Sequence, residues 1–160
     1  MRIGFGYDSH RFEKGRRLVL GGVEFPGEDG LAGHSDADVL THAVIDALLG
    51  AAALGDIGSH FPDTDERWKG ADSVAMLASV VKEVRAAGYA VGNVDATVVC
   101  ERPKIGSAVD IVRQRLATAM GVGKGRVSVK GKTNEGMDDV GARVGIVVHC
   151  VALLEELRGR

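Results

Sequence analysis

Hydrophobic and polar residues alternate at the start of the chain. Ile3, Phe5 and Tyr7 occupy one side of the alternation, while Asp8 and His10 occupy the other side together with two glycines. A period of two residues is typical of a β-strand with two different faces. The pattern therefore predicts a strand over the first twelve residues that carries Asp8 and His10 on one face near its end.

An apolar stretch with helical periodicity follows in the sequence HSDADVLTHAVIDALLGAAALGDIG. Ser35 precedes Asp38 by the spacing of a capping box, so we expect the helix to begin near Asp36. His34 would then lie just before the first turn, where free backbone N–H groups and the helix dipole favour an anion such as phosphate. The stretch is thus predicted to provide half of a metal and phosphate site.

Polar residues recur at every fourth position along this helix. Asp38, His42 and Asp46 therefore lie on one stripe. Packed against the first strand, the stripe would give Asp8, His10 and His42, a ligand set suited to Zn²⁺ that leaves a fourth position open. Asp46 is expected to accept the other N–H of His42, and Asp38 is assigned with it to the surroundings of the ligands. From the residues alone, an alternative stays open in which Asp8 caps a turn and the histidines are ordinary core or surface residues.

The rest of the chain divides into shorter elements. Gly21-Gly22 supplies the positive φ angles of a tight turn, and Ser107 is expected to cap a helix that stops at Gly121. The patterns predict a hairpin over 17–25, a loop over 26–33, an irregular polar segment over 56–70, helices over 72–87 and 107–120, and strands over 89–102, around 127–129 and over 143–157.

The final predicted strand, RVGIVVHCVALLEEL, is apolar on both faces. Such a strand is covered on both sides, and because only three helices are available, one side is expected to need another subunit. The order of elements contains one β-α-β crossover and predicts an α/β fold, an α+β sandwich in which helices cover one face of a mixed β-sheet. No internal repeat or linker divides the sequence, so residues 1–160 are expected to form a single domain.

Composition narrows the class of partner. A net charge of −2 with scattered basic residues, and only one Trp, two Tyr and four Phe, give no reason to expect nucleic acid. The longest apolar run, residues 43–54, contains Asp46 and is too short to cross a membrane. Cys100 and Cys150 lack metal-binding or redox spacing, and nothing at Met1 resembles a secretory segment, which favours a reducing cytoplasm. The expected partner is a small molecule.

Several polar loop residues are further candidates, although on sequence alone solvated surface charge is the favoured explanation for each. They are Asp56, Asp63 and Asp65 for sugar-like hydroxyl groups, Lys104 with Lys132-Thr133 for a nucleotide, and Glu135 for a hard cation. His60 and His149 have no partner pattern and are interpreted as structural.

Four motifs together resemble one known family. They are RIGFGYDSHRF, HSDADVLTHAVIDALLGAAALGDIGSHFPDTD, GNVDATVVCERPK and KTNEG, and they extend over nearly the whole chain. In these motifs the chain is similar to the 2-C-methyl-D-erythritol 2,4-cyclodiphosphate synthase family of the non-mevalonate isoprenoid pathway. The resemblance implies a homotrimer whose sheets pack around a central axis, with active sites between subunits.

The resemblance also implies the reaction, that of a phosphorus–oxygen lyase. The substrate would be 4-diphosphocytidyl-2-C-methyl-D-erythritol 2-phosphate, whose 2-phosphate attacks the β-phosphorus of the same molecule and releases CMP. A phosphate monoester is already largely anionic at neutral pH, so no activated serine or cysteine is needed. Zn²⁺ and a second ion, Mg²⁺ or Mn²⁺, would assist.

Matched to the family motifs, each candidate residue acquires an implied role. The implied metal ligands are Asp8, His10 and His42 for Zn²⁺ and Glu135 for the second ion. The groups implied to stabilise charge on the reacting phosphates are His34 and Thr133, with support from Ser35. The implied contacts of the substrate are Asp56, Ile57, Gly58, Phe61, Asp63 and Asp65 for the methylerythritol part and, from the neighbouring subunit, Cys100, Pro103, Lys104, Ile105, Gly106, Gly131, Lys132 and Thr133 for cytidine.

One segment departs from the family pattern. After Glu135 the family commonly has a Gly-Phe pair and a basic Gly-Arg-Gly turn, whereas this chain reads GMDDVGARVG. Asp138 and Asp139 replace neutral residues, and the arginine is displaced to Arg143. We therefore expect an isoprenyl diphosphate to bind weakly or not at all in the central channel of a trimer; tight binding measured by calorimetry would contradict this.

Two other functions fit the same residues. One is a zinc-dependent phosphohydrolase, in which the open metal position activates water. The other is a trimeric nucleotide-binding protein in which zinc is structural. The synthase would yield a cyclic product, the hydrolase a linear one, and the binding protein none.

Overall fold

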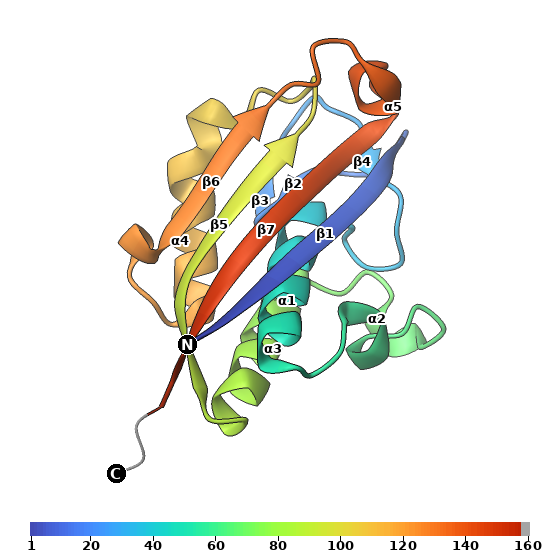
Figure 1. Ribbon diagram of the computed structural model, residues 1–160. Helices are drawn as coiled ribbons and strands as arrows, with labels where there is room; N and C mark the ends of the chain where they lie inside the picture. Colours follow the sequence, from blue (N-terminus) through green and yellow to red (C-terminus); the bar gives the residue numbers. More distant parts are fainter. Residues whose placement is uncertain (158–160) are drawn as a thin grey trace.

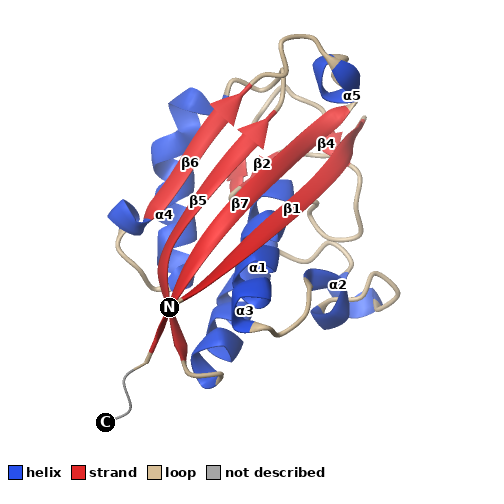
Figure 2. Cartoon of the chain, viewed as in Figure 1, coloured by secondary structure: helices blue, strands red, loops and turns tan. Residues whose placement is uncertain are grey.

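The computed structural model describes residues 1–157, whose long strands form one sheet with helices on one side (Figure 1). The strands of this sheet are β1 (Arg2–Glu13), β4 (Gly30–Leu31), β5 (Tyr89–Val99), β6 (Val127–Lys132) and β7 (Gly145–Glu156), and β2 (Val19–Leu20) pairs with β3 (Val23–Glu24). The helices are α1 (Val39–Ala52), α2 (Ile57–His60), α3 (Ser73–Ala86), α4 (Val109–Met120) and α5 (Asp138–Gly141), with 3-10 turns at Glu66–Trp68, Ile105–Ala108 and Lys124–Arg126. Because α1, α3 and α4 all lie behind the sheet (Figure 2), the predicted α/β class is confirmed.

The order of strands in the sheet is β4-β1-β7-β5-β6. Strand β7 runs antiparallel to β1 and β5, whereas β5 and β6 are parallel and are joined through α4. This connection is the β-α-β crossover that the sequence predicted, and it makes the sheet mixed. The loop predicted over 26–33 is interrupted by β4, which pairs with Phe12 and Glu13 at the end of β1.

Two glycines of β1 allow α1 to pack directly on the strand. A Cβ atom at Gly4 would lie 1.9 Å from the carbonyl oxygen of Ala47, and one at Gly6 would lie 2.0 Å from that of Ala43. Only glycine permits so close an approach of the two backbones. The alternation in β1 thus does two things: it sets the strand against the helix, and it turns Asp8 toward α1.

Helix α1 begins at Val39 with Asp38 as its N-cap, later than the sequence predicted. Ala37 has a left-handed backbone with a φ of 57°, so a helix cannot run through it. The carboxyl group of Asp38 accepts the N–H of Thr41 at 3.0 Å and its hydroxyl at 2.7 Å. The predicted capping box from Ser35 is therefore wrong.

Asp38 also ties α1 to the hairpin. Its buried carboxyl oxygens accept the N–H groups of Gly21 at 2.8 Å and Gly22 at 2.7 Å, in the predicted turn between β2 and β3. Burial raises the pKa of Asp38, against the hydrogen bonds from Thr41 and the two glycines. These hydrogen bonds join the hairpin to the first helical turn and none of them reaches His42, so the predicted supporting role beside the metal ligands is not found.

The segment predicted to be irregular, residues 56–70, contains α2 and the 3-10 turn Glu66–Trp68. Asp56 caps α2 by accepting the N–H of Ser59 at 2.8 Å. Asp65 caps the turn by accepting the N–H of Arg67 at 3.0 Å. Two of the acidic residues that suggested a solvated loop, Asp56 and Asp65, are therefore helix caps.

The boundaries near the nucleotide candidates also differ from the prediction. Helix α4 begins at Val109 without a side-chain cap, because Ser107 lies inside the preceding 3-10 turn. The helix ends at Gly121, whose φ of 66° is left-handed, as predicted. Strand β5 ends at Val99, before the predicted end at Arg102.

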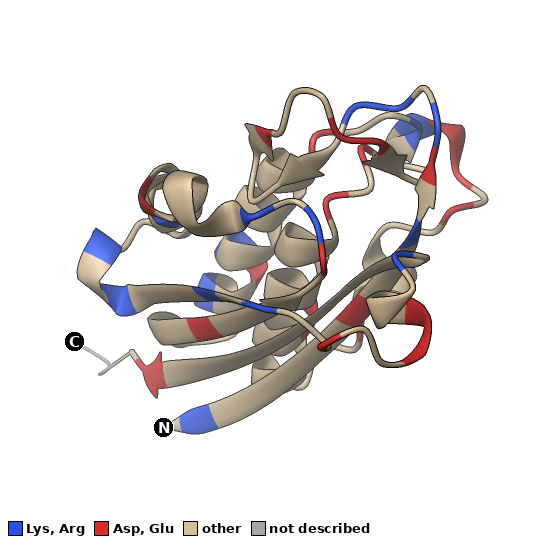
Figure 3. Ribbon diagram, turned by 90° about the horizontal axis from the view of Figure 1, so that it is seen from above, with Lys and Arg blue, Asp and Glu red and all other residues tan. Residues whose placement is uncertain are grey.

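The two faces of the sheet differ in exposure. Ile146 and Cys150 are fully buried against the helices, whereas Phe5, Tyr7 and Val151 on the other face are 61%, 51% and 45% exposed. In Figure 3 most of the blue and red positions lie in loops and at strand ends, and only single bands fall along the strands. Within one chain, β7 is therefore covered on one side only. No helix among residues 1–157 has the length and apolarity needed to cross a membrane.

Candidate metal and nucleotide sites

The contact between β1 and α1 brings three metal-binding side chains together. Asp8 Oδ2 lies 3.0 Å from His10 Nε2 and 3.1 Å from His42 Nδ1. The two ring nitrogens are 3.3 Å apart, and the three ligand atoms all lie within 4.8 Å of one another. The prediction that these residues meet is confirmed, although the strand and helix that carry them are far apart in the sequence.

Each imidazole is oriented by a contact on its outer nitrogen. His10 Nδ1 donates to the carbonyl oxygen of Ala32, which leaves Nε2 facing the cluster. His42 Nε2 lies 2.8 Å from Ser73 Oγ and 3.2 Å from Ser35 Oγ, which leaves Nδ1 facing the cluster. These outer contacts hold the rings in the orientation that a shared metal ion needs.

Asp46 is not the hydrogen-bond partner of His42, so that prediction is wrong. Its Oδ1 atom accepts the N–H of Ile57 at 2.8 Å and thereby anchors the start of α2 to α1. Burial raises the pKa of Asp46, and the neighbouring charge of Asp8 adds to the rise. Helical spacing correctly put Asp46 one turn from His42, but it could not show which neighbour the carboxyl group would choose.

The electrostatics of the cluster favour a cation. Burial alone would raise the pKa of Asp8, but hydrogen bonds from His10 and His42 outweigh it and hold this pKa well below its ordinary value. Burial would lower the pKa of His10, but the hydrogen bond and charge of Asp8 raise it above the ordinary 6.5. The three facing ligand atoms, all within 4.8 Å of one another, mark the position that a divalent ion would take. One carboxylate and two imidazoles are a donor set that fits Zn²⁺ with one coordination position left open.

The cluster lies in the wall of a cavity of about 360 Å³. Predicted residues that line this cavity, besides the three ligands, are His34, Ser35, Ile57, Gly58, Phe61 and Asp63. Pro62, inside the loop 61–65 that the resemblance implied for the methylerythritol part, also lines it, as do Trp68 and Met76, which the sequence did not single out. Trp68 packs edge-on against Phe61 with ring centroids 4.8 Å apart and gives the cavity an apolar side. Trp68 could have been identified from the sequence as a lining residue, because it is an aromatic residue inside a polar segment.

Three other candidates are placed differently from the expectation. Asp56 and Asp65 lie outside the cavity lining; Asp65 instead forms a bidentate ion pair with Arg67, with distances of 2.9 Å and 2.6 Å. His34 lies at the cavity with Nε2 3.2 Å from the carbonyl oxygen of Asp65. It does not stand at a free helix start, because the carboxyl group of Asp38 already caps α1 where a phosphate was expected.

A second cavity, of about 320 Å³, lies where the parallel strands β5 and β6 end. Its lining consists of residues that the family resemblance implied for cytidine: Cys100, Pro103, Lys104, Ile105, Gly106, Gly131, Lys132 and Thr133. At Gly131 a Cβ atom would lie 2.9 Å from the side chain of Ile105, so a larger residue here would require that side chain to shift. Burial raises the pKa of the Cys100 thiol to about 11, which makes it a packing group rather than a nucleophile.

The loop after β6 carries Glu135, whose φ of 53° is left-handed. Thr133 donates its hydroxyl proton to Glu135 Oε1 at 3.0 Å. Glu101 Oε1 accepts the N–H groups of Asn134 at 3.0 Å and Gly136 at 3.3 Å and so holds the loop on both sides of Glu135. Glu101 lies inside the run 100–106 implied for cytidine, but its contact with this loop was not predicted, because it depends on backbone groups more than thirty residues away.

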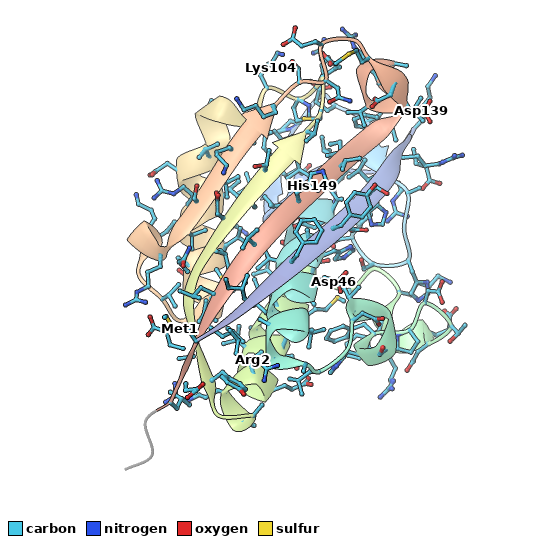
Figure 4. All side chains as sticks on the ribbon, viewed as in Figure 1. Met1, Arg2, Asp46, Lys104, Asp139 and His149 are labelled. Atoms are coloured by element: carbon cyan, nitrogen blue, oxygen red, sulfur yellow. The ribbon has the colours of Figure 1, made fainter. Side chains whose placement is uncertain are left out.

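The two cavities share no lining residue, and neither Thr133 nor Glu135 lines the cavity of the metal cluster. In Figure 4, Lys104 lies at the top, beyond the ends of β5 and β6, while Asp46 lies much lower beside α1. Thr133 and Glu135 are therefore not brought to the metal cluster within one chain. Arg143, the displaced arginine, lies beside Lys104 in a groove that adjoins the second cavity.

Comparison with known proteins adds independent findings. The YgbB family model matches residues 1–155. A 2-C-methyl-D-erythritol 2,4-cyclodiphosphate synthase of Salinibacter ruber is 57% identical over 97% of this chain and 99% of its own length. A bifunctional enzyme IspD/IspF of Anaeromyxobacter sp. is 58% identical over 98% of this chain, which spans 40% of that relative. A solved structure of a 2C-methyl-D-erythritol-2,4-cyclodiphosphate synthase in a CDP-bound form is similar with a TM-score of 0.88 and 39% identity, over 96% of this chain and 100% of that one.

Proposed function

This chain belongs to the YgbB family, and from that membership we propose that it is a 2-C-methyl-D-erythritol 2,4-cyclodiphosphate synthase of isoprenoid biosynthesis. The observation that carries the proposal is the convergence of Asp8, His10 and His42 in the wall of a cavity. The reaction converts 4-diphosphocytidyl-2-C-methyl-D-erythritol 2-phosphate into the cyclic diphosphate and CMP, and the enzyme is a phosphorus–oxygen lyase.

For this reaction the protein must position the reacting groups and stabilise their charge, and it need not supply a nucleophile. An oxygen of the 2-phosphate forms a bond to the β-phosphorus, and the bond from that phosphorus to the oxygen of the α-phosphate breaks. CMP departs with the bridging oxygen, and no water is consumed. Because the attacking group is already anionic, holding its two ends together and neutralising charge supply the catalysis.

Metal ions complete the charge balance in this proposal. Asp8, His10 and His42 would hold Zn²⁺, and Glu135 would contribute to a site for Mg²⁺ or Mn²⁺. When bound, such ions act as Lewis acids toward phosphate oxygens. The low pKa of Asp8 keeps its carboxylate available as a ligand throughout the neutral range.

The remaining residues divide between the two ends of the substrate. In the metal cavity, His34 stabilises phosphate charge with support from Ser35, and Asp63 binds hydroxyl groups. The apolar side formed by Phe61 and Trp68 receives the methyl group. In the second cavity, the residues around Lys104 bind cytidine, and Thr133 donates its hydroxyl proton to a phosphate instead of to Glu135.

A complete site would require a second copy of the chain. The two cavities lie apart in one chain, and the apolar sheet face that carries Phe5 and Tyr7 is open. A homotrimer that buries this face around a central axis would set the metal cavity of one copy against the nucleotide cavity of the next. We further propose that residues 1–160 act as one domain and that the protein works in the cytoplasm, where its two buried free cysteines stay reduced.

The direct test is product analysis. We expect the purified protein, supplied with Zn²⁺, Mg²⁺ and the diphosphocytidyl substrate, to form CMP and the cyclic diphosphate in equal amounts, measured by mass spectrometry and phosphorus NMR. CMP with a linear diphosphate would instead identify a phosphohydrolase. Binding of CDP without any product would identify a nucleotide-binding protein.

A further inference from the structure

His42 is the most buried of the three clustered residues, with 8% of its surface exposed. Its outer nitrogen, Nε2, points away from the cavity, toward Ser73 and Asp36. Nε2 lies 2.8 Å from the hydroxyl of Ser73, the fully buried first residue of α3. Ser73 in turn is held twice by Asp36: its hydroxyl donates to Oδ1, and its N–H donates to Oδ2 at 3.1 Å. A chain of hydrogen bonds therefore links His42 through Ser73 to a carboxylate.

Counting protons along this chain fixes the state of the imidazole. A serine hydroxyl has one proton to donate, and Ser73 gives it to Asp36. Toward His42 the hydroxyl oxygen can then only accept, so Nε2 carries a proton. Nδ1 faces Asp8 at 3.1 Å and donates a proton to it. A metal ion would take the place of that proton, and with Nε2 still protonated the lone pair of the neutral imidazole would then lie on Nδ1.

We propose that Ser73, held by Asp36, is a positioning residue that selects the tautomer and ring orientation of His42 for metal binding. The inference rests on the metal role proposed above. His10 is oriented differently, by the backbone carbonyl of Ala32, which no side-chain substitution removes. The Ser73–Asp36 pair thus supplies the shorter of the two side-chain contacts on the outer nitrogen of His42, and it connects α3 to the proposed metal ligands on β1 and α1.

Ser35 provides a matched comparison. Its hydroxyl lies near the same nitrogen at the longer distance of 3.2 Å and accepts the N–H of Ala37 at 3.2 Å. Among the hydrogen bonds of the described residues, none joins the Ser35 hydroxyl to Asp36, so no carboxylate fixes the direction of this hydroxyl. We therefore expect Ser35 to contribute much less than Ser73 to metal affinity.

The experiment measures zinc affinity of the metal-free full chain by competition with a chromophoric chelator. We expect Ser73→Ala to weaken zinc binding about 10- to 100-fold, as loss of an outer partner of a ligating histidine does. Asp36→Asn should weaken it less, because the amide oxygen can still accept the serine proton. Ser35→Ala should stay close to the wild type.

A second readout separates positioning from loss of fold. In zinc-loaded protein labelled with ¹⁵N-histidine, we expect the Nε2 proton of His42 to exchange with water faster in Ser73→Ala than in the wild type, while unfolding by urea remains cooperative. If Ser73→Ala does not fold, zinc affinity and exchange of the Nε2 proton are measured on Asp36→Asn instead. Wild-type zinc affinity in both variants, or an equal loss in Ser35→Ala, would overturn the inference and leave the proposed reaction standing. A wild-type protein that binds no divalent ion would overturn both.

Discussion

The cavity beside Asp8 and the cavity beside Lys104 are supported by different parts of the fold. The proposed metal ligands stand on β1 and α1, whose backbones touch at Gly6, and each of the two imidazoles has a defined hydrogen-bond partner behind it. The proposed nucleotide cavity is lined largely by the segments that follow β5 and β6. Side chains on packed helices and strands keep the positions of ligand atoms fixed, whereas connecting segments supply the lining of a cavity.

The difference follows the chemistry expected of each half. A metal ion loses affinity when its ligands move by a fraction of an ångström, so its site belongs where packing is tightest. A nucleotide base is held by several weaker contacts, and the loss of one lowers affinity without abolishing it. Substitutions should therefore act steeply in the first cavity and gradually in the second.

Removal of a metal ligand is expected to have the largest effect. His42→Ala should lower kcat on the order of 10³-fold, about 4 kcal/mol, because charge on the reacting phosphates is no longer neutralised. CMP affinity should change little, since His42 does not line the second cavity. Steady-state kinetics, calorimetry with CMP and size-exclusion chromatography with light scattering measure these quantities. Loss of a trimer in this variant would assign zinc a structural role instead.

The next largest effect is expected from a substitution that separates β1 from α1. Gly6→Ala would set a Cβ atom 2.0 Å from the carbonyl oxygen of Ala43, and we expect it to lower the free energy of unfolding by roughly 3 kcal/mol. Gly50→Ala, in the same helix, is the control: its nearest contact is 3.9 Å away, and it should stabilise by about 1 kcal/mol. Urea unfolding measures both, and equal stability of the two variants would contradict the packing account.

In the second cavity the expected effect is smaller. Lys104→Ala should weaken CMP binding about 10-fold, the loss of one charge-assisted hydrogen bond, and leave zinc affinity unchanged. Lys14→Ala, at an exposed lysine of the loop after β1, should change neither. Isothermal calorimetry distinguishes the two variants, and a loss of zinc affinity in Lys104→Ala would show that the cavities are coupled.

The mildest expected change is the response of metal affinity to pH. The pKa of His10 is raised above 6.5, while that of Asp8 is lowered, so acidification protonates the imidazole and leaves the carboxylate charged. Zinc must displace this proton. Affinity should therefore fall about twofold when the pH reaches the raised pKa and approach tenfold for each unit below it. Chelator competition at several pH values measures the slope; a flat profile would remove His10 from the ligands.

The sequence predicted the elements whose pattern is local. The alternation in β1 correctly gave the face that Asp8 and His10 share, and helical spacing correctly gave the side of α1 that carries His42. The two glycines of β1 were visible as part of this alternation. Their reason, direct contact with α1, appears only when the strand and helix are seen together.

Features that depend on distant residues could not be predicted in this way. Asp38 looked like the end of a capping box, but its carboxyl group is taken by Gly21 and Gly22 of the hairpin. Asp46 looked like the partner of His42, yet Ser73, from another helix, has that place. In each case the helical spacing correctly placed the side chain on its side of the helix, and contacts with residues distant in the sequence determined its hydrogen-bond partner.

The central claim is that Asp8, His10 and His42 bind one divalent ion. X-ray diffraction data collected on both sides of the zinc absorption edge, from crystals of the protein purified with CDP, test it most directly. We expect one anomalous peak per chain that appears above the zinc edge, within bonding distance of Asp8 Oδ2, His10 Nε2 and His42 Nδ1. A map in which these three groups point apart with no peak between them would contradict the account.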